Sequence, residues 1–404
     1  MSEKNEISQY IVTTALMGFG HLRAAHNIAS FGHATVARVD REPYVGLVDK
    51  IVWDGAQNTH THASREVDGK NKLLYNWFEG MMKIPEGDSS PSMAASRFVR
   101  AIGKLGVGRK FFTSLDSRYP TLVHTFYLPA MLSVYRKYPG RDFLLLCDTD
   151  FHRVWVPVDP KAGNLKYMVP ISKSADRLIS YGVRPDEIYT TGFPLPAAYT
   201  GTKDLSTLIT AFNARRNRLR RDSNVPFTLM FPFSGAGAYF NLLAELVKSM
   251  TGSFIEGSLR LIVFCGDNER AFTGTKNLFI SCNLEDSEYT EIIFDKDIFS
   301  SFDRFNEALK STDLIITKPS ELVFYAALGI PMAFLPPIGS HEARNREYLI
   351  ENGCAVDLPD ISEFSRWLDE NRKNEKLLSL AEEGYRSLPR MGASQIHELV
   401  TGSK

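Results

Sequence analysis

Short runs of apolar and β-branched residues recur along the chain, and apolar residues repeat every three or four positions in the segments between them. The runs that predict strands in the first half are 10–16, 34–39, 121–125 and 143–147. Those in the second half are 227–231, 261–265, 278–280, 314–317 and 332–335. Continuous apolar runs of this length are typical of strands that helices cover on both faces of a parallel sheet. The pattern therefore predicts an α/β protein.

The alternation of strands and helices restarts near residue 200. A polar, Arg-rich helix is expected at 203–221, and a new series of strands begins at Phe227. Each half opens with a strand and a loop of small residues, as doubly wound Rossmann-like domains do. We therefore expect an N-terminal domain over 1–200 and a C-terminal domain over 201–404. The ligand site is expected in a cleft between the two lobes, and the C-terminal helices are expected to pack back toward the first domain.

Composition narrows the class of protein. Hydrophobic residues make up 44% of the 404 residues, charged residues 23%, and the formal net charge is zero. A balanced charge gives no field for nucleic acid. The four cysteines have no CxxC spacing, so we expect free thiols, with Cys147 and Cys265 in buried strands. Because no secretory signal and no membrane-spanning run is evident, we expect a cytoplasmic protein that could still contact a membrane surface.

A glycine loop with a histidine follows the first predicted strand. Gly18 and Gly20 let the backbone turn and let a ligand approach closely, and the helix that begins there directs free N–H groups at it. An imidazole at His21 could serve as general base toward a hydroxyl group. The alternative is a glycine turn with a structural histidine.

Two loops in the second half could bind phosphate. The small residues 234–238 follow a strand and precede a helix, although a tight packing turn would have the same sequence. After the strand at 314–317, Ser320 is expected to cap a short helix that Gly329 ends. Glu321 either accepts a hydrogen bond from a ribose diol or is an acid placed favourably in a first helical turn.

Polar residues also follow other predicted strands. Residues 340–345 begin a helix at the expected ligand edge of the second sheet. In the first half, Asp148, Asp150 and His152 follow the most apolar strand. Two acids and a histidine at this spacing in a loop are a weak metal signature, so we expect no metal.

Residues 89–115 contain five basic side chains and no acid. Aromatic and aliphatic residues are interleaved with Arg97, Arg100, Lys104, Arg109 and Lys110. Such a segment either lies on an anionic membrane or is an ordinary helix with its apolar side on the sheet and its basic side in water. The second interpretation is the favoured one.

These segments, in this order, resemble the GT-B glycosyltransferases, in particular the group that contains the monogalactosyldiacylglycerol synthases and the peptidoglycan N-acetylglucosaminyltransferase. The resemblance covers most of the chain. Its motifs are 18–21 with 23–25, 149–152 with Trp155, 188–194, 265–268, 317–319, and Glu342, Asn345, Tyr348 and Leu349.

The resemblance implies metal-independent, inverting transfer of a sugar from a nucleotide diphosphate donor, expected to be UDP-linked, to a hydroxyl of a lipid or glycan acceptor. No cofactor is implied. His21 would be the catalytic base, and the helix starts near Ser234 and Ser320 would stabilise the leaving diphosphate. The implied donor-binding residues are Gly20, Ser234, Gly235, Ala236, Gly237, Lys318, Ser320, Glu321, Leu322, His341, Glu342 and Asn345. Those implied on the acceptor side are Gly18, Phe19, His124, Asp150, His152 and Trp155.

The sequence departs from the family pattern in the second half. Thr317-Lys318-Pro319 is not followed by the family's two glycines, Phe324 stands where the family has a ribose-binding Glu, and His341 stands where it has a Gln. These departures motivate a second hypothesis, a non-catalytic nucleotide or nucleotide-sugar binding protein on the same scaffold. A sugar-nucleotide epimerase is a third hypothesis, which rests on analogy of fold alone.

Overall fold

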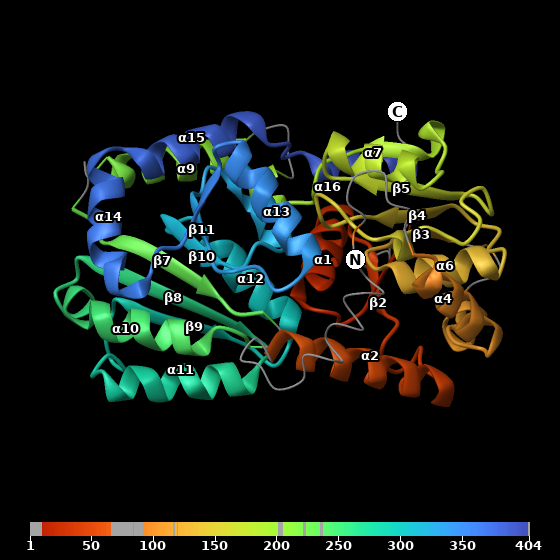
Figure 1. The fold of residues 1–404 in the computed structure, drawn as a ribbon, viewed down its shortest axis with the longest axis horizontal. Coiled ribbons are helices and arrows are strands. Elements are labelled where there is room, and N and C mark those ends of the chain that lie inside the picture. Colours follow the sequence, from red (N-terminus) through yellow and green to blue (C-terminus); the bar gives the residue numbers. More distant parts are fainter. Residues whose placement is uncertain are drawn as a thin grey trace, which may run out of the picture. The chain divides into compact units, whose positions relative to one another are not determined.

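The computed structural model describes residues 10–65, 84, 92–115, 118, 120–200, 205–220, 224–234 and 237–402. Its contacts divide the chain into two compact units (Figure 1). Unit 1 comprises residues 1–60, 69–201 and 389–404, and unit 2 comprises 61–68 and 202–388. Each unit is an α/β structure built on its own parallel sheet.

Unit 1 contains a six-stranded parallel sheet in the order β2-β1-β3-β4-β5-β6. Its strands are β1 (Tyr10–Thr14), β2 (Thr35–Arg38), β3 (Thr121–His124), β4 (Asp142–Leu145), β5 (Leu165–Val169) and β6 (Ile188–Thr190). In register, Thr13 lies opposite Ala37 on one side and His124 on the other. The chain adds β2 on one side of β1 and then crosses to β3 on the other side. This reversal makes the carboxyl ends of β1 and β3 the switch point of the sheet, where ligands bind in doubly wound folds.

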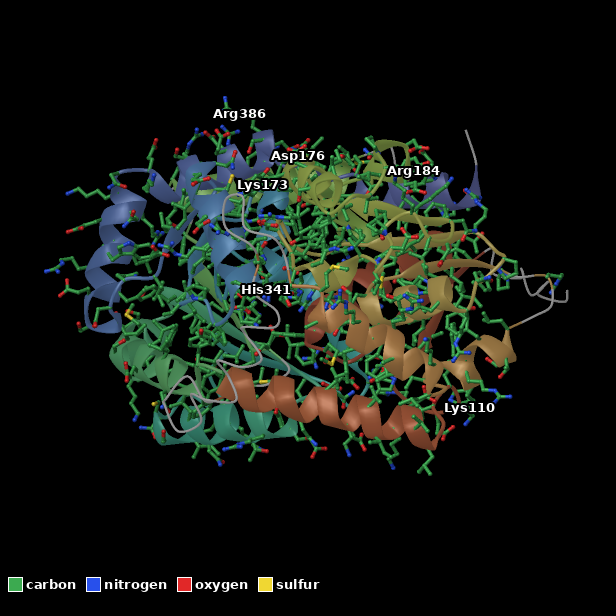
Figure 2. All side chains as sticks on the ribbon, turned by 45° about the vertical axis from the view of Figure 1, so that its right-hand side comes forward. Lys110, Lys173, Asp176, Arg184, His341 and Arg386 are labelled. Atoms are coloured by element: carbon green, nitrogen blue, oxygen red, sulfur yellow. The ribbon has the colours of Figure 1, made fainter. Side chains whose placement is uncertain are left out.

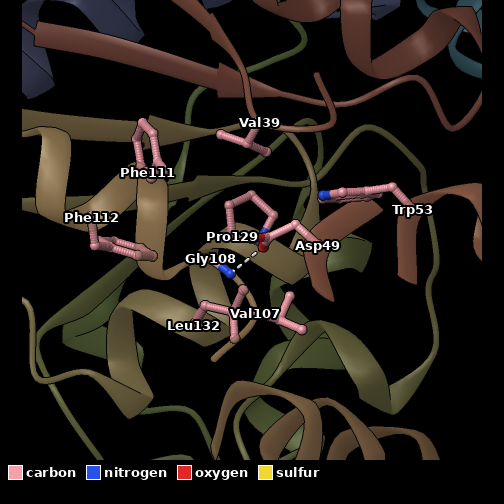
Figure 3. Close-up of a pocket in the computed structure, with 9 residues that line it drawn as sticks. All are labelled: Val39, Asp49, Trp53, Val107, Gly108, Phe111, Phe112, Pro129 and Leu132. Atoms are coloured by element: carbon pink, nitrogen blue, oxygen red, sulfur yellow. Dashed lines mark hydrogen bonds between the residues drawn. The ribbon is translucent and has the colours of Figure 1, made fainter. Parts of the chain in front are cut away.

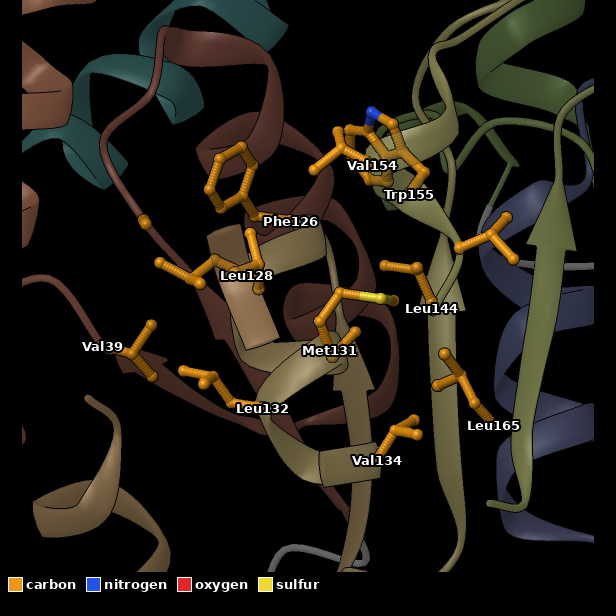
Figure 4. Packing of buried hydrophobic residues seen from close by; sticks show 14 of the residues in the cluster. Val39, Phe126, Leu128, Met131, Leu132, Val134, Leu144, Val154, Trp155 and Leu165 are labelled. Atoms are coloured by element: carbon orange, nitrogen blue, oxygen red, sulfur yellow. The ribbon is translucent and has the colours of Figure 1, made fainter. Parts of the chain in front are cut away.

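Helices and the sheet of unit 1 enclose a hydrophobic core. In Figure 4, Met131 lies against Leu144 of β4, and Leu132 lies beside Val39. The helices are α1 (Phe19–Gly32), α2 (Leu47–Arg65), α4 (Ala94–Lys104), α5 (Arg109–Ser114), α6 (Tyr127–Tyr135), α7 (Ser172–Ser180), α8 (Ala197–Thr200) and α16 (Gly392–Thr401), with 3-10 turns η2 (Arg153–Trp155) and η3 (Pro185–Glu187).

The C-terminal helix α16 completes unit 1. It packs on α1, and the ring of His397 lies 5.4 Å from that of Phe31. The start of α16 approaches the 192–194 loop so closely that a Cβ at Gly392 would collide with the backbone carbonyl of Phe193. The predicted domain boundary assigns 389–404 to the second domain, with its helices packing back toward the first; in the structure these residues are part of unit 1.

Unit 2 contains a second six-stranded parallel sheet, in the order β12-β11-β10-β7-β8-β9. Its strands are β7 (Phe227–Pro232), β8 (Leu259–Gly266), β9 (Thr290–Phe294), β10 (Leu314–Thr317), β11 (Met332–Phe334) and β12 (Ala355–Asp357). The chain runs from β7 to β8 and β9, and then returns past β7 to β10. The switch point of this sheet therefore lies between β7 and β10.

Helices cover the sheet of unit 2, and the apolar side chains of its strands are buried. The helical elements are α9 (Ser206–Leu219), α10 (Phe240–Ile255), α11 (Glu269–Ser281), α12 (Ile298–Ala308), η4 (Glu321–Leu328), α13 (Ser340–Glu351), η5 (Ile361–Glu363), α14 (Phe364–Lys373) and α15 (Lys376–Ser387).

The predicted α/β class with two doubly wound parallel sheets is confirmed. The Arg-rich helix is α9, although its Arg215 is fully buried and donates to the backbone carbonyls of Leu309 and Thr312. One predicted strand is wrong, because 278–280 lies in the last turns of α11. Leu278 and Phe279 are buried there, so their apolar character reflects a helix face and not a strand.

Candidate functional site

Two loops lie at the switch point of unit 2, one after β7 and one after β10. In the first loop, the hydroxyl of Ser234 is buried and has no hydrogen-bond partner among the residues that the structure describes. Gly237 has a left-handed backbone (φ 69°), and its N–H donates to the carbonyl of Ser234 over 2.9 Å. The predicted residues Gly235 and Ala236 lie outside the described residues. The loop therefore presents an unsatisfied hydroxyl next to the start of α10, a helix whose first N–H groups favour an anion.

A third loop approaches the one after β7. Asn268 caps α11 by accepting a hydrogen bond from the N–H of Ala271 at 3.0 Å. A Cβ at Gly237 would lie 3.2 Å from Nδ2 of Asn268, a tight contact, and the positive φ of Gly237 also favours glycine at this position. Asn268 belongs to the motif at 265–268 but is not among the predicted site residues. Its spacing after β8 is the only sequence signal for it.

The loop after β10 carries the predicted Lys318. Its ammonium group forms an ion pair with Glu342, which is 2% exposed. The other carboxylate oxygen of Glu342 accepts the backbone N–H of Ile338 at 2.8 Å. Burial acts to raise the pKa of Glu342, but Lys318, His341 and the Ile338 N–H together hold that pKa below its ordinary value.

The same loop is fastened by a second side chain of α13. The amide nitrogen of Asn345 donates to the carbonyl of Pro319 over 3.1 Å, and Asn345 is fully buried. Glu342 and Asn345 are predicted to contact the donor. Both are buried and hold the loop through their hydrogen bonds, and their contact with a donor stays a prediction. His341, at the first turn of α13, is half-buried.

The segment after Ser320 is a 3-10 helix, η4. Ser320 occupies the predicted N-cap position, but its hydroxyl makes no capping hydrogen bond. Gly329 ends the segment in the left-handed conformation, as expected. Glu321 is 8% exposed, and the side chain of Leu322 is buried, so Leu322 has only its backbone to offer a ligand.

Tyr239 links the loops after β7 and β11. Its hydroxyl donates to the carbonyl of Pro336, and its backbone is left-handed (φ 68°), which costs free energy for a residue with a Cβ. Because β10 lies between β7 and β11, this bond crosses the carboxyl end of β10. No sequence signal predicts Tyr239, because its unusual conformation depends on the fold.

The switch point of unit 1 carries the predicted histidine. Gly18 turns the chain with a positive φ of 88°, Phe19 is buried, and Gly20 and His21 lie in the first turn of α1. The half-buried ring of His21 packs against Phe126 and Trp155, with ring centroids 5.0 and 5.7 Å away. The backbone carbonyl of His21 accepts a hydrogen bond from the hydroxyl of Thr125 at 3.0 Å.

Neighbouring groups fix this loop and limit the choice of base. Asp40, just after β2, accepts the N–H of Leu16 at 3.2 Å and pairs with Arg38. Tyr127 lies 5.5 Å from Trp155, and burial raises the pKa of Tyr127 to about 12. Tyr127 therefore stays protonated at neutral pH and cannot serve as a base at this edge. Sequence reasoning missed Asp40.

The other predicted acceptor-side residues differ in exposure. Trp155 lies beside His21, as the motif implies, and His152 is half-buried. Asp150 is 2% exposed, and its two oxygens pair with the guanidinium of Arg177 at 2.6 and 2.7 Å. Asp150 therefore anchors α7 instead of offering a carboxylate to an acceptor.

His124 does not fit the predicted acceptor-side role. It is fully buried, with one ring nitrogen 2.6 Å from the hydroxyl of Thr13 and the other 2.7 Å from Asp142. The second oxygen of Asp142 accepts the hydroxyl of Ser133. These bonds join β1, β3, β4 and α6, so His124 is a structural residue.

Three further observations bound the site. Among the described residues, no three His, Cys, Asp or Glu side chains gather as metal ligands would. A pocket in unit 1 is mainly apolar, and its carboxylate, Asp49, accepts the N–H groups of Gly46 and Gly108 (Figure 3). The pocket contains no predicted site residue. No helix in the described part of the chain is long and apolar enough to cross a membrane.

Comparisons with known proteins agree with the fold. Residues 270–387 match the family model DUF6938, a domain of unknown function. No curated protein matches the sequence. Among solved structures, S. aureus MnaA in complex with UDP is 13% identical, with a TM-score of 0.52 over 96% of this chain and 94% of that chain. The UDP-GlcNAc 2-epimerase of Neisseria meningitidis bound to UDP-GlcNAc is 10% identical, with a TM-score of 0.50 over 97% and 98%.

At these identities the likeness establishes the fold. The chain has the GT-B architecture of two Rossmann-like units that the resemblance implies. The comparisons do not single out the monogalactosyldiacylglycerol synthases or the peptidoglycan N-acetylglucosaminyltransferase as its relatives.

Proposed function

We propose that unit 2 binds a nucleoside diphosphate sugar, with UDP as the nucleotide, and that the protein transfers the sugar to an acceptor hydroxyl. One observation carries the proposal: the buried hydroxyl of Ser234, which has no hydrogen-bond partner within the described part of the chain, lies at the switch point of the sheet that also carries the Lys318 loop. An unpartnered buried hydroxyl is costly, so it indicates a ligand that completes it. Two proteins with this fold are bound to UDP or UDP-GlcNAc, which supports the choice of nucleotide.

Unit 1 supplies the proposed base. An imidazole nitrogen of His21 takes the proton of the acceptor hydroxyl, and the hydroxyl oxygen forms a bond to the anomeric carbon of the sugar. The bond from that carbon to the diphosphate oxygen breaks with inversion, and its electron pair stays on the diphosphate. The first N–H groups of α10 and the ammonium of Lys318 stabilise this charge, so the proposed step uses no metal ion.

Transfer assays with the full chain test the proposal. A panel of UDP-sugars is incubated with lipid and glycan acceptors, and donor binding is measured by calorimetry. His21→Ala is expected to lower transfer by about 10²–10⁴-fold, the usual contribution of a general base, and to leave donor binding unchanged. His33→Asn at the other end of α1 is the matched control, because Asn tolerates the left-handed backbone of His33 (φ 49°). Transfer that His21→Ala leaves intact would rule out the assigned base.

A non-catalytic nucleotide-binding role is the second candidate. Phe324, which replaces the family's ribose-binding Glu, is 1% exposed, and Glu342 and Asn345 are engaged inside the protein. Tight UDP binding without transfer or hydrolysis would favour this role. Conversion of the donor sugar without any acceptor would instead assign an epimerase activity, and absence of UDP binding would contradict all three.

A further inference from the structure

Helix α4 divides its surface into three stripes. Ala95, Ser96, Val99 and Ile102 face the protein and are buried. The remaining side chains face outward, where an amphipathic helix of a globular protein usually carries only polar groups. Two large apolar residues interrupt this rule: Phe98 is 62% exposed and Leu105, the C-cap, is 73% exposed.

The exposed apolar residues follow one line along the helix. Ala94, Phe98, Ala101 and Leu105 are spaced four, three and four positions apart, which places them on one side of an α-helix. Arg97, Arg100 and Lys104 form a parallel basic stripe beside them. One half of the outward surface is thus apolar and the other half is cationic.

Two neighbouring elements extend this composition. At the start of α2, Leu47 and Ile51 are 80% and 67% exposed. The start of α2 is tied to α5, because Asp49 accepts the N–H of Gly108 at 2.5 Å and Lys110 donates to the carbonyl of Val45 at 3.0 Å. The side chain of Lys110 extends from the outside of unit 1 in Figure 2.

Few carboxylates oppose these cations. Residues 89–115 contain no acid, and within the described residues Arg97, Arg100, Lys104 and Arg109 form no ion pair. Lys110 pairs with Glu42, whose side chain is 73% exposed, and Asp54 is the exposed acid of α2 near this region. The surface is therefore net positive.

We propose that this docking face, formed by α4, α5 and the first turns of α2, binds the surface of an anionic lipid bilayer. Basic side chains next to a negatively charged leaflet and apolar side chains among the headgroups are the two signals that together give stable peripheral binding. Phe98 and Leu105 project outward instead of lining a groove, a geometry that suits a deformable lipid surface. The proposal does not depend on sugar transfer.

Vesicle sedimentation of the full chain tests the proposal. Vesicles of phosphatidylcholine alone are compared with vesicles that also contain phosphatidylglycerol, at low and high salt. We expect binding only to the anionic vesicles, weakening as salt rises. Arg97→Glu/Lys104→Glu is expected to reduce the partition coefficient by more than about tenfold, because each basic residue contributes about fivefold. Phe98→Ser/Leu105→Ser is expected to reduce it by about tenfold through the loss of apolar insertion.

Matched controls sit elsewhere on the molecule. Lys173→Glu/Lys248→Glu reverses two exposed charges, and Ile209→Ser/Ile255→Ser removes two apolar residues that are 46% and 60% exposed. Circular dichroism verifies that each variant is folded. Failure to bind anionic vesicles, equal binding to neutral vesicles, or docking-face variants that behave like these controls would overturn the proposal. Dimerisation that Phe98→Ser/Leu105→Ser abolishes, without vesicle binding, would assign the surface to a second copy of the chain and would also overturn it.

Discussion

The carboxylate of Glu342 shows how single residues shape the candidate site. It joins Lys318 of the loop after β10 to the N–H of Ile338 in the loop after β11. A buried carboxylate with a cation and a backbone donor is stabilised in its charged form, which is why its pKa is lowered. Glu342 thereby sets the position of a cation that the proposed reaction uses.

Glu342→Gln is expected to destabilise unit 2 by about 3 kcal/mol, because breaking one side of a buried ion pair leaves the other charge uncompensated. A group whose pKa is lowered by folding contributes stability above its unfolded pKa and loses it as the pH falls through the folded value. The difference between the two proteins should therefore be full at neutral pH and shrink below about pH 4. Urea denaturation at a series of pH values measures it; a difference independent of pH would contradict the assignment.

A site residue could be predicted from the sequence where nearby residues determine its position. His21 follows β1 directly, and a glycine turn before a helix start brings it to the switch point. His124 and Asp150 resemble His21 in sequence, because each is a polar residue at or after the end of an apolar strand. Their partners, Asp142 and Arg177, lie 18 and 27 positions away along the chain. Whether such a group is engaged inside the fold depends on these distant partners, so sequence reasoning assigned both to the acceptor side.

At the level of elements, apolar runs identified β1, β3 and β4 of the first sheet and β7, β8 and β10 of the second, but they missed β5, which lies inside the first sheet. Three edge strands were also missed: β6 and β12 have three residues each, and most residues of β9 are only half-buried, so none of them forms a long apolar run. The run at 278–280 was assigned to a strand because three apolar residues cannot distinguish a strand from a buried helix turn. A run of three residues is too short to show whether the apolar positions repeat with the period of a strand or of a helix.

Contacts between elements depend on two glycines that pattern analysis did not identify. Gly392 lets α16 reach the carbonyl of Phe193, and Gly384 lets α15 reach that of Ala326. Gly392→Ala is expected to cost about 1–3 kcal/mol, because the added methyl overpacks this contact. Gly252→Ala in α10 is the control: its Cβ would meet open space, and it should stabilise by about 0.5–1 kcal/mol. Thermal unfolding measures both, and equal effects would contradict the packing argument.

At the scale of the whole molecule, the stability of unit 1 depends on the return of the chain after unit 2 to form helix α16. Helix α16 buries Ala393, Ile396 and Val400, and its terminal carbonyls accept hydrogen bonds from Arg141. Removal of 389–404 would expose the surface of α1 that this helix covers. Each buried aliphatic side chain contributes about 1.5–3 kcal/mol, so the loss is large relative to the stability of a domain.

A chain that ends at Leu388 is therefore expected to lose stability selectively in unit 1. Hydrogen exchange read by mass spectrometry should show faster exchange in α1 and β1. Peptides from β7 and β8 should keep their protection and serve as the internal control. Unchanged exchange in α1 would show that α16 is dispensable.

The same connectivity makes residues 202–388 an insertion within a host domain whose ends both lie outside it. Such an inserted segment can be exchanged between homologous chains by recombination at its two ends, which leaves unit 1 and His21 intact. If unit 2 binds the donor and unit 1 the acceptor, as proposed, recombination of this kind would change the nucleotide or sugar that is recognised while keeping the acceptor unaltered. The C-terminal helix α16 would remain with unit 1 in such an exchange, so its packing on α1 would be preserved.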